Sequence, residues 1–406
     1  MRNRFLIALA AAALHLSIGS VYAFSVLVRP IMEELDSSMG EISFAFSLAI
    51  LFLGFSAGFL GSFVEKLGPK KSGLIAAAFF GAGMLGTAYA IDAKSLELLY
   101  LFYGVIGGIG LGVGYITPVS TLVKYFPQHK GFATGLAIMG FGFAALIAGP
   151  VMQHLTAVFG LVNNFLIMGS AYFVIMTLSA LYLKPPTYAK DAPAAKVLKR
   201  GYTANAAMKT WQFSALWLIF FVNITCGIGL LAVASPMAQE VIGMTPAMAA
   251  SLVGIIGIFN GGGRIFWSTV SDYLGRKNIY PLFFAFEIIA FILLANAANS
   301  YVFSALILLI ITCYGGGFSC MPAYLADLFG TRELSTIHGR ILTAWGIAGV
   351  VGPAIVAYFH EISQGYSLSL CFFAGLFVVN LLVAMKLRSG KLQETSDAIV
   401  TKEIEA

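Results

Sequence analysis

Apolar residues along this chain gather in long blocks that short polar stretches separate. A helix of about 20 apolar residues crosses the ~30 Å hydrocarbon layer of a bilayer. Because each block is about that long, the pattern predicts an all-α membrane protein with twelve transmembrane helices. The blocks cover residues 7–31, 42–64, 73–91, 97–123, 131–153, 163–183, 212–238, 246–270, 279–298, 301–325, 339–359 and 366–387.

The composition is typical of a membrane protein. Of the 406 residues, 59% are hydrophobic and 10% are charged, whereas soluble domains carry about 25% charged residues. Arg2 and Arg4 precede the first block, as in a secretory signal peptide, but the apolar run is longer than such peptides usually have. We therefore expect the first block to remain as an uncleaved helix.

Lysine and arginine are distributed unequally between alternate loops. Arg29 and Lys94 fall in the loops of one side, whereas the other loops and the tail hold nearly all of the remaining basic residues. Because loops rich in Lys and Arg stay in the cytoplasm, both termini are predicted to be cytoplasmic, in a plasma or bacterial inner membrane. The same asymmetry explains the net charge of +6, so no nucleic-acid partner is indicated.

The cysteines show no metal-ligand spacing, and each falls within an apolar block. Buried free thiols are therefore expected. The four residues are Cys226, Cys313, Cys320 and Cys371.

A long polar stretch with three prolines follows the sixth block and divides the chain into two halves. The predicted organisation is an N-terminal six-helix bundle over 1–184, a cytoplasmic linker over 185–210, a C-terminal six-helix bundle over 211–388 and a cytoplasmic tail over 389–406.

The two halves share sequence features in the same order. Glu65–Lys66–Leu67–Gly68 follows the second block, and Asp272–Tyr273–Leu274–Gly275 follows the eighth. Residues 114–126 align in the same way with 317–329. This parallel repeat predicts two pseudo-symmetric bundles with a ligand site between them.

Arg264 is the only charge in the apolar stretch Pro246–Val270. Asp272 marks the end of this helix, so Arg264 lies roughly 12 Å from that end and near the middle of the bilayer. A guanidinium there costs at least ~2.5–3.5 kcal/mol and cannot lose its proton. The sequence therefore predicts that Arg264 binds an anionic ligand; a buried ion pair is the alternative.

The repeated acidic–basic–glycine loop resembles the signature of the major facilitator superfamily, and the resemblance covers essentially the whole chain. It implies the twelve-helix major facilitator fold. The acid and the basic residues are expected to latch the two conformations, and the first copy departs from the pattern with Glu65 for Asp and Pro69 for Arg. The gating candidates are Glu65, Lys66, Asp272 and Arg276, with Asp327 and Arg340 as a further pair flanking the loop after the tenth block.

A narrower resemblance is to the oxalate/formate antiporter family and the related monocarboxylate transporters. It rests on Asn260–Gly–Gly–Gly–Arg264, Lys124–Tyr–Phe–Pro127 and Asp327–Leu–Phe–Gly–Thr331. In both families the arginine of the eighth helix binds the substrate carboxylate, and the resemblance implies this role for Arg264. Further cavity residues that it implies are Tyr22, Tyr115, Tyr314, Phe318, Asn260 and Trp345.

Two departures from these families bear on substrate and coupling. The oxalate antiporter has a second cation, a lysine, where this chain has Trp345. One fixed positive charge suits one carboxylate, because a dianion would leave a charge uncompensated in low dielectric. Proton-coupled monocarboxylate transporters place an Asp where this chain has Asn260, which cannot titrate. Anion exchange is therefore favoured unless another residue carries the proton.

His15 and Glu287 are the candidates for that proton carrier, because both lie midway along apolar blocks. Histidine titrates near neutral pH, and a buried carboxyl group can stay protonated. The alternatives are a neutral His15 bonded to a backbone carbonyl and a protonated Glu287 bonded to a neighbouring helix.

We expect a secondary transporter of a small monocarboxylate such as lactate, pyruvate, formate or acetate, by anion exchange or proton symport. The alternatives are an oxalate-type dicarboxylate antiporter and a multidrug efflux carrier, although a lone arginine argues against cationic drugs. The chain has no metal-ligand spacing, nucleophile elbow or phosphate loop, so neither an enzyme nor a cofactor is expected. A monomer is expected.

Overall fold

The computed structural model describes residues 3–186 and 201–389. Within these ranges the chain forms helices joined by short turns, and no strands are present. The elements of the first half are α1 (Arg4–Gly19), the 3₁₀ helix η1 (Ser20–Val26), α2 (Val28–Leu35), α3 (Met39–Asp92), α4 (Leu96–Leu99), the π-helix η2 (Tyr100–Gly107), α5 (Gly108–Tyr125), α6 (Lys130–Phe159) and α7 (Leu161–Tyr182). Those of the second half are α9 (Ala204–Met208), α10 (Trp211–Ile242), α11 (Pro246–Leu274), α12 (Arg276–Leu294), α13 (Ser300–Phe329), α14 (Leu334–Ser363) and α15 (Ser367–Ser389).

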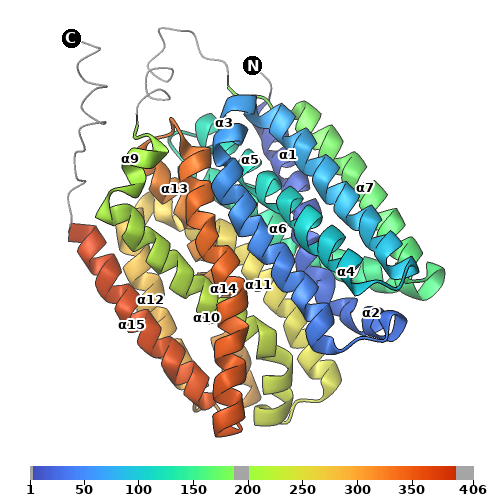
Figure 1. Cartoon of the computed structure of the whole chain (residues 1–406). Helices are drawn as coiled ribbons and strands as arrows, with labels where there is room; N and C mark the ends of the chain where they lie inside the picture. The colour runs from blue at the N-terminus through green and yellow to red at the C-terminus, as the bar shows by residue number, and fades with distance from the viewer. Residues whose placement is uncertain (1–2, 187–200, 390–406) are drawn as a thin grey trace, which may run out of the picture.

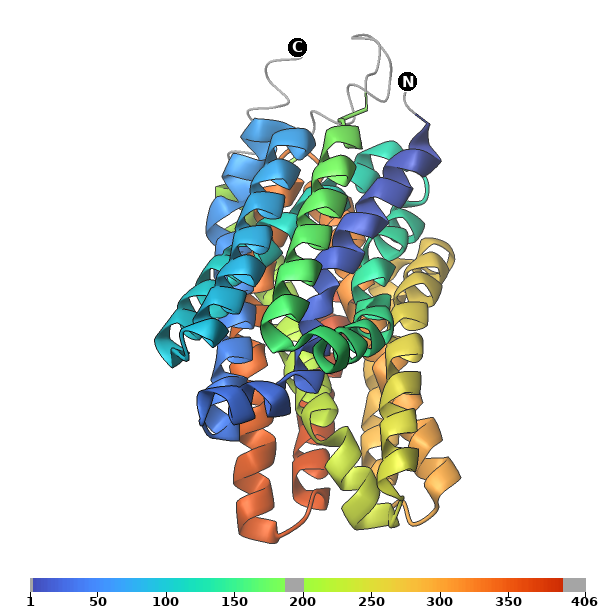
Figure 2. The same ribbon diagram turned by 90° about the vertical axis from the view of Figure 1, so that its right-hand side faces the viewer.

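The helices form two groups that lie side by side. Helices α1–α7 pack largely with one another, and so do α10–α15 (Figure 1). Helix α1 begins and α15 ends at the same end of the molecule, which we call the terminal face (Figure 2). The twelve predicted spans all fall on helices, and ten of the described helical segments are long and apolar enough to cross a membrane. The all-α fold predicted from the sequence is therefore confirmed.

Two of the predicted spans belong to one continuous element, α3. The helix turns back at Gly68, whose φ of 77° and ψ of 168° are not helical. A positive φ at this position favours glycine, and Pro69 follows directly with a ring that suits the first turn of a new helix. Gly275, at the equivalent point of the repeat, has φ 80° and separates α11 from α12. The two copies therefore share a backbone turn as well as residue types.

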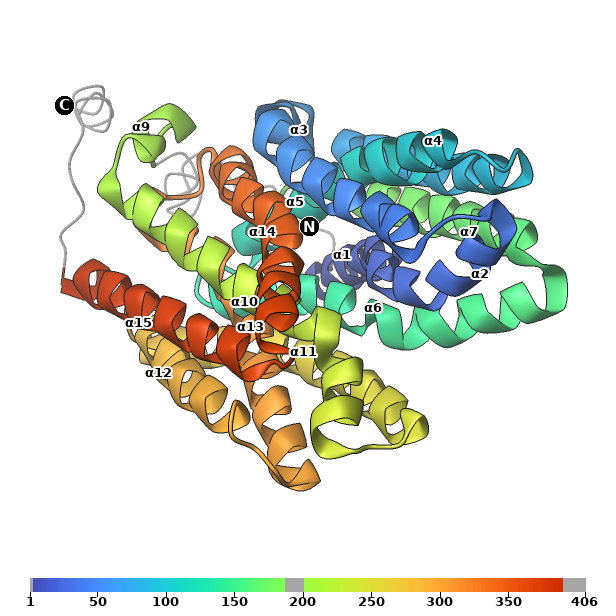
Figure 3. The same ribbon diagram turned by 60° about the horizontal axis from the view of Figure 1, so that its bottom comes forward.

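The two groups meet along two close crossings, α3 with α14 and α6 with α11 (Figure 3). A Cβ on Gly54 would stand 2.8 Å from the Gly346 Cα, and one on Gly142 would stand 2.6 Å from the Gly261 Cα. Larger side chains would hold the backbones apart at these points, so the glycines permit the close packing that membrane helices use.

The predicted linker and tail lie mostly outside the described residues, which resume at Gly201 and end at Ser389. The described end of the linker, Gly201, forms an antiparallel bridge to Gly330 at the end of α13. One cysteine prediction was wrong: Cys226, Cys313 and Cys320 are buried, but Cys371 is exposed. Cys371 lies on the outer surface of α15, where apolar residues also face outward.

Candidate substrate site

Arg264 of α11 is fully buried at the junction of the two helix groups. Its Nε donates to the Oδ1 of Asn260, one helical turn earlier, at 3.1 Å. Both terminal nitrogens, Nη1 and Nη2, are buried without a hydrogen-bond partner among the described residues. Within that part of the chain no carboxylate forms an ion pair with Arg264, which disfavours the buried ion pair as its role.

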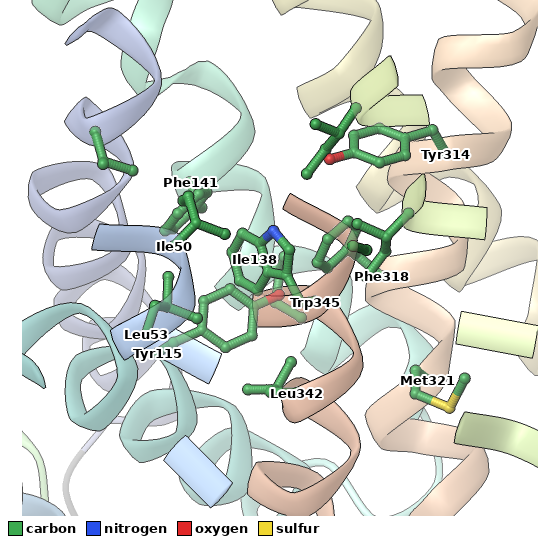
Figure 4. Packing of buried hydrophobic residues seen from close by; sticks show 14 of the residues in the cluster. Ile50, Leu53, Tyr115, Ile138, Phe141, Tyr314, Phe318, Met321, Leu342 and Trp345 are labelled. Atoms are coloured by element: carbon green, nitrogen blue, oxygen red, sulfur yellow. The ribbon is translucent and has the colours of Figure 1, made fainter. Parts of the chain in front are cut away.

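Aromatic rings enclose the guanidinium from both helix groups. The Arg264 Cζ lies 5.7 Å from the ring centroid of Phe141 on α6 and 5.0 Å from that of Phe318 on α13. Trp345 of α14 packs between these two rings, with centroid distances of 5.5 and 4.7 Å, and Figure 4 shows the three side chains together. Tyr115 of α5 lies 5.2 Å from Trp345. Cation–π contact stabilises the charge in the absence of a counter-anion.

Several hydrogen-bond donors in this enclosure have no acceptor. The hydroxyl of Tyr115 and the indole nitrogen of Trp345 are buried without a partner among the described residues, like the two Arg264 nitrogens. The hydroxyls of Tyr22 and Tyr314 lie 3.5 Å apart across the two helix groups. Arg264 acts electrostatically on both, and the Tyr22 and Tyr115 hydroxyls also face its side chain from beyond hydrogen-bonding distance. Unpaired buried donors are costly, so this arrangement is suited to an anion that brings acceptor oxygens.

The backbone of Arg264 is held in place by two hydroxyl groups. Ser268 on the same helix and Ser319 on α13 donate to its carbonyl oxygen at 2.6 and 2.7 Å. Ser319 in turn accepts, through its own carbonyl, a 2.6 Å hydrogen bond from Thr134 of α6. These contacts join the backbone of Arg264 to the opposite helix group.

The acid of the second repeat copy joins the two helix groups at the terminal face. The Asp272 carboxylate accepts from the backbone N–H groups of Gly131 at 2.9 Å and Phe132 at 2.8 Å, in the first turn of α6. Arg276 pairs with the same carboxylate. An anion at a helix N-terminus is stabilised by the helix dipole and free N–H groups, so the geometry is that of an inter-group latch.

The first repeat copy makes the equivalent contact. Glu65 accepts from the backbone N–H of Ser335, in the first turn of α14, at 3.1 Å, and pairs with Lys124 at 2.7 Å. Lys66 is exposed at this face. The basic partner of Glu65 is thus Lys124 on α5 rather than the adjacent Lys66.

Asp327 and Arg340 lie near each other in sequence, but each has another partner. Asp327 pairs with Lys130 of the opposite helix group at 2.8 Å and with Arg276 at 3.1 Å. The Nη1 of Arg340 lies 2.7 Å from the sulfur of Met208. Asp327 therefore extends the Asp272 latch, whereas the proposed Asp327–Arg340 pair is not formed in this conformation.

The two candidate proton carriers have different environments. His15 of α1 is fully buried, and both of its ring nitrogens face backbone carbonyls. Glu287 of α12 is also buried, and its Oε2 has no partner among the described residues. Helix α12 packs on α15 and α13, away from the junction between the groups, so Glu287 lies apart from Arg264.

Sequence reasoning missed Phe141, which contacts Arg264, Tyr22, Tyr115 and Trp345. A phenylalanine between two glycines, Gly140 and Gly142, was the available signal, because glycines allow an opposing helix close to the ring. A small cavity lined by Ser20, Phe24, Phe80, Tyr103, Met152 and Phe165 lies within the N-terminal helices, and none of the proposed site residues lines it.

Comparisons with known proteins agree with this architecture. The chain is 26% identical over 356 residues to the oxalate:formate antiporter of Oxalobacter formigenes, covering 87% of this chain and 84% of that protein. It is 22% identical over 448 aligned positions to monocarboxylate transporter 14 of Mus musculus, covering 90% and 86%. The crystal structure of the E. coli fucose:proton symporter FucP superposes with a TM-score of 0.74 at 15% identity, covering 96% of this chain and 100% of that one.

The family model described as Major Facilitator Superfamily matches residues 8–353 and 216–403. The first match alone covers more than half of the chain, and it includes both repeat copies and Arg264. The chain is therefore a multi-pass membrane transporter that belongs to the Major Facilitator Superfamily.

Proposed function

We propose that this protein carries small monocarboxylate anions, of the lactate, pyruvate, formate or acetate class, across a plasma or bacterial inner membrane with both termini in the cytoplasm. The observation that carries the proposal is the fully buried Arg264, whose two terminal nitrogens have no hydrogen-bond partner within residues 3–186 and 201–389. A carboxylate accepts two parallel hydrogen bonds from a guanidinium, and it would satisfy both nitrogens at once.

The surroundings of Arg264 support a small substrate with an apolar end. Trp345 fills the space between Phe141 and Phe318, so little room remains beyond the carboxylate. The Tyr115 hydroxyl and the Trp345 indole nitrogen are further donors for the carboxylate oxygens, while the rings suit a methyl or methylene group. A short alkyl carboxylate matches both properties.

Alternating access provides the transport step. Among the described residues, hydrogen bonds join the two helix groups at the Tyr22–Tyr314 contact and at the terminal face, where Asp272 and Glu65 accept from the opposite group. Tyr22 is partly exposed whereas Arg264 is fully buried. The structure is thus sealed on its terminal side, and we infer that rocking of the groups about Arg264 opens that side and releases the substrate.

A dicarboxylate such as oxalate is the second candidate substrate, favoured by the similarity to the oxalate:formate antiporter. The site holds one fixed positive charge, and Trp345 stands where the resembling family has a lysine. A second carboxylate would then lie among aromatic rings without a cation, which is costly. The monocarboxylate is therefore preferred.

Uptake into proteoliposomes tests the proposal. Labelled lactate, pyruvate, formate, acetate and oxalate would be offered to the wild type and to Arg264→Ala, with and without unlabelled anion inside. We expect uptake of at least one monocarboxylate, lost in the variant. Transport of oxalate alone would identify the dicarboxylate alternative, and undiminished uptake by Arg264→Ala would refute the role of Arg264.

A further inference from the structure

His15 lies between two backbone carbonyl oxygens, an arrangement that a neutral histidine satisfies at one ring nitrogen and an imidazolium satisfies at both. Its Nδ1 stands 2.6 Å from the carbonyl oxygen of Ala137 on α6, and its Nε2 stands 3.0 Å from that of Tyr115 on α5. Carbonyl oxygens only accept hydrogen bonds. A neutral imidazole donates from one nitrogen, so its other lone pair would face a carbonyl oxygen, whereas an imidazolium donates to both.

We propose that His15 is a proton-binding site and that its proton is carried together with the anion on Arg264. This inference rests on the proposed function and adds its coupling ion. The two carbonyl groups take the place of water around the imidazolium, which is why a proton can be held at this depth in the membrane.

The surroundings of His15 contain few other charges. Arg264 acts on it electrostatically. His338 of α14 also interacts with it. Both ring nitrogens of His338 are buried without a hydrogen-bond partner in the part of the chain that the structure describes, so no acceptor there stabilises a proton on that ring. The ring of Tyr115 lies between the two histidines, 5.0 Å from His15 and 6.0 Å from His338. The other titratable residues on the elements packed against α1 are Tyr22 on η1, Lys124 and Tyr125 on α5, Lys130 and His154 on α6, and Tyr172 and Tyr182 on α7.

Arg264 links the proton to the substrate. With the site empty, the guanidinium charge repels an imidazolium at His15, which opposes protonation. A carboxylate bound to Arg264 neutralises that charge and removes the repulsion. Proton and anion therefore favour each other's binding, and the coupling is reciprocal by thermodynamic linkage.

The charge of the site is the same in the empty and the fully loaded carrier. Asn260 and two aromatic rings contact the Arg264 guanidinium and stabilise its positive charge within the helices. Adding one anion and one proton leaves that net charge unchanged. Both the empty and the fully loaded carrier can then change between the two conformations, as symport requires. Asn260 does not need to titrate, because His15 carries the proton.

The test is the pH dependence of lactate binding to the purified protein in nanodiscs, measured by calorimetry, together with the proton uptake that accompanies binding in weakly buffered solution. For the wild type we expect one proton to be taken up per lactate bound. At pH values where His15 of the free protein is deprotonated, the dissociation constant for lactate should rise about tenfold per pH unit. His15→Gln should bind lactate with a dissociation constant that does not change with pH, and without proton uptake. His338→Gln is the matched control and should behave like the wild type.

The outcomes separate this inference from the proposed function. If the wild type binds no small monocarboxylate, the proposed function fails; if it binds lactate without a pH slope, the proton site alone fails. The site is also refuted if His15→Gln keeps the slope or His338→Gln loses it. Should His15→Gln not fold, ¹⁵N NMR of histidine in the wild type decides: one buried ring must become an imidazolium when lactate is added, and no change would overturn the proposal.

Discussion

The carboxylate of Asp272 accepts the backbone N–H of Gly131 at 2.9 Å, across the junction between the two helix groups. Glu65 makes the corresponding contact with Ser335 at 3.1 Å. Each acid lies at the end of one helix and accepts from the first turn of a helix in the other group. The sequence repeat therefore corresponds to a matching pair of contacts between the groups, and both are formed in the conformation described here.

Removing the charge of the second latch should shift the protein towards the conformation that is open at the terminal face. A hydrogen bond to a charged group contributes ~1.5–3 kcal/mol, so Asp272→Asn should change the ratio of the two conformations by about tenfold or more. The measurement is the distance between spin labels on Lys66 and Arg332, both exposed at that face, in a background with Cys371→Ser. An unchanged distance distribution would show that Asp272 does not hold the groups together.

The crossing of α3 and α14 should not tolerate a side chain at Gly54. A Cβ there would stand 2.8 Å from the Gly346 backbone, so Gly54→Ala should prevent the two helices from closing and reduce transport at least about tenfold. The same change at Gly40, on the same helix, meets nothing closer than the Ser38 hydroxyl at 4.0 Å and should leave transport unchanged. Equal transport rates in the two variants would mean that the close crossing has no role in the cycle.

A second cation at position 345 should alter the preference between monoanions and dianions. Trp345→Lys places an ammonium beside Phe318 and Phe141, where it can pair with a second carboxylate. Because a charge-assisted hydrogen bond contributes ~1.5–3 kcal/mol, the ratio of oxalate to lactate affinity should rise about tenfold or more. Trp345→Met removes the indole without adding charge and serves as the control. A similar rise in that variant would attribute the change to volume rather than charge.

Glu287 should not take part in coupling. It lies on α12, which packs mainly on α15 and α13, and no hydrogen bond or ion pair among the described residues joins it to Arg264, Asp272 or Glu65. We expect Glu287→Gln to keep the transport rate and its pH dependence within about twofold of the wild type, because the amide retains the shape of a protonated carboxyl group. A pH profile that changes in this variant would move the proton site from His15 to Glu287.

Much of the fold could be predicted from the sequence because each span carries its own apolar signal. The positions of the twelve spans and the burial of Arg264 follow from local hydrophobicity and from the cost of a charge in lipid. The partners of Glu65 and Asp272 across the junction could not be predicted in this way. Ser335 and Gly131 contribute backbone N–H groups, which leave no trace in side-chain chemistry. The Lys124 partner of Glu65 lies on α5, outside the repeated loop that contains Glu65 and Lys66.

The site shows the same division between local and long-range information. The family resemblance implied Asn260 as a site residue, and its hydrogen bond to the guanidinium one helical turn away is present. Phe141 could not, because its contact with Arg264 depends on how closely α6 and α11 cross. The two carbonyl groups around His15 likewise depend on the packing of α1 against α5 and α6.

The central claim is that Arg264 holds the substrate carboxylate with both of its terminal nitrogens. The most direct measurement is the equilibrium binding of lactate to purified wild type, Arg264→Lys and Arg264→Ala by calorimetry at one pH. We predict that Arg264→Lys weakens binding at least about tenfold although it keeps the charge, because an ammonium cannot supply the planar pair of donors, and that Arg264→Ala abolishes measurable binding. Wild-type affinity in Arg264→Lys would contradict the two-nitrogen geometry, and wild-type affinity in Arg264→Ala would contradict the assignment of the site.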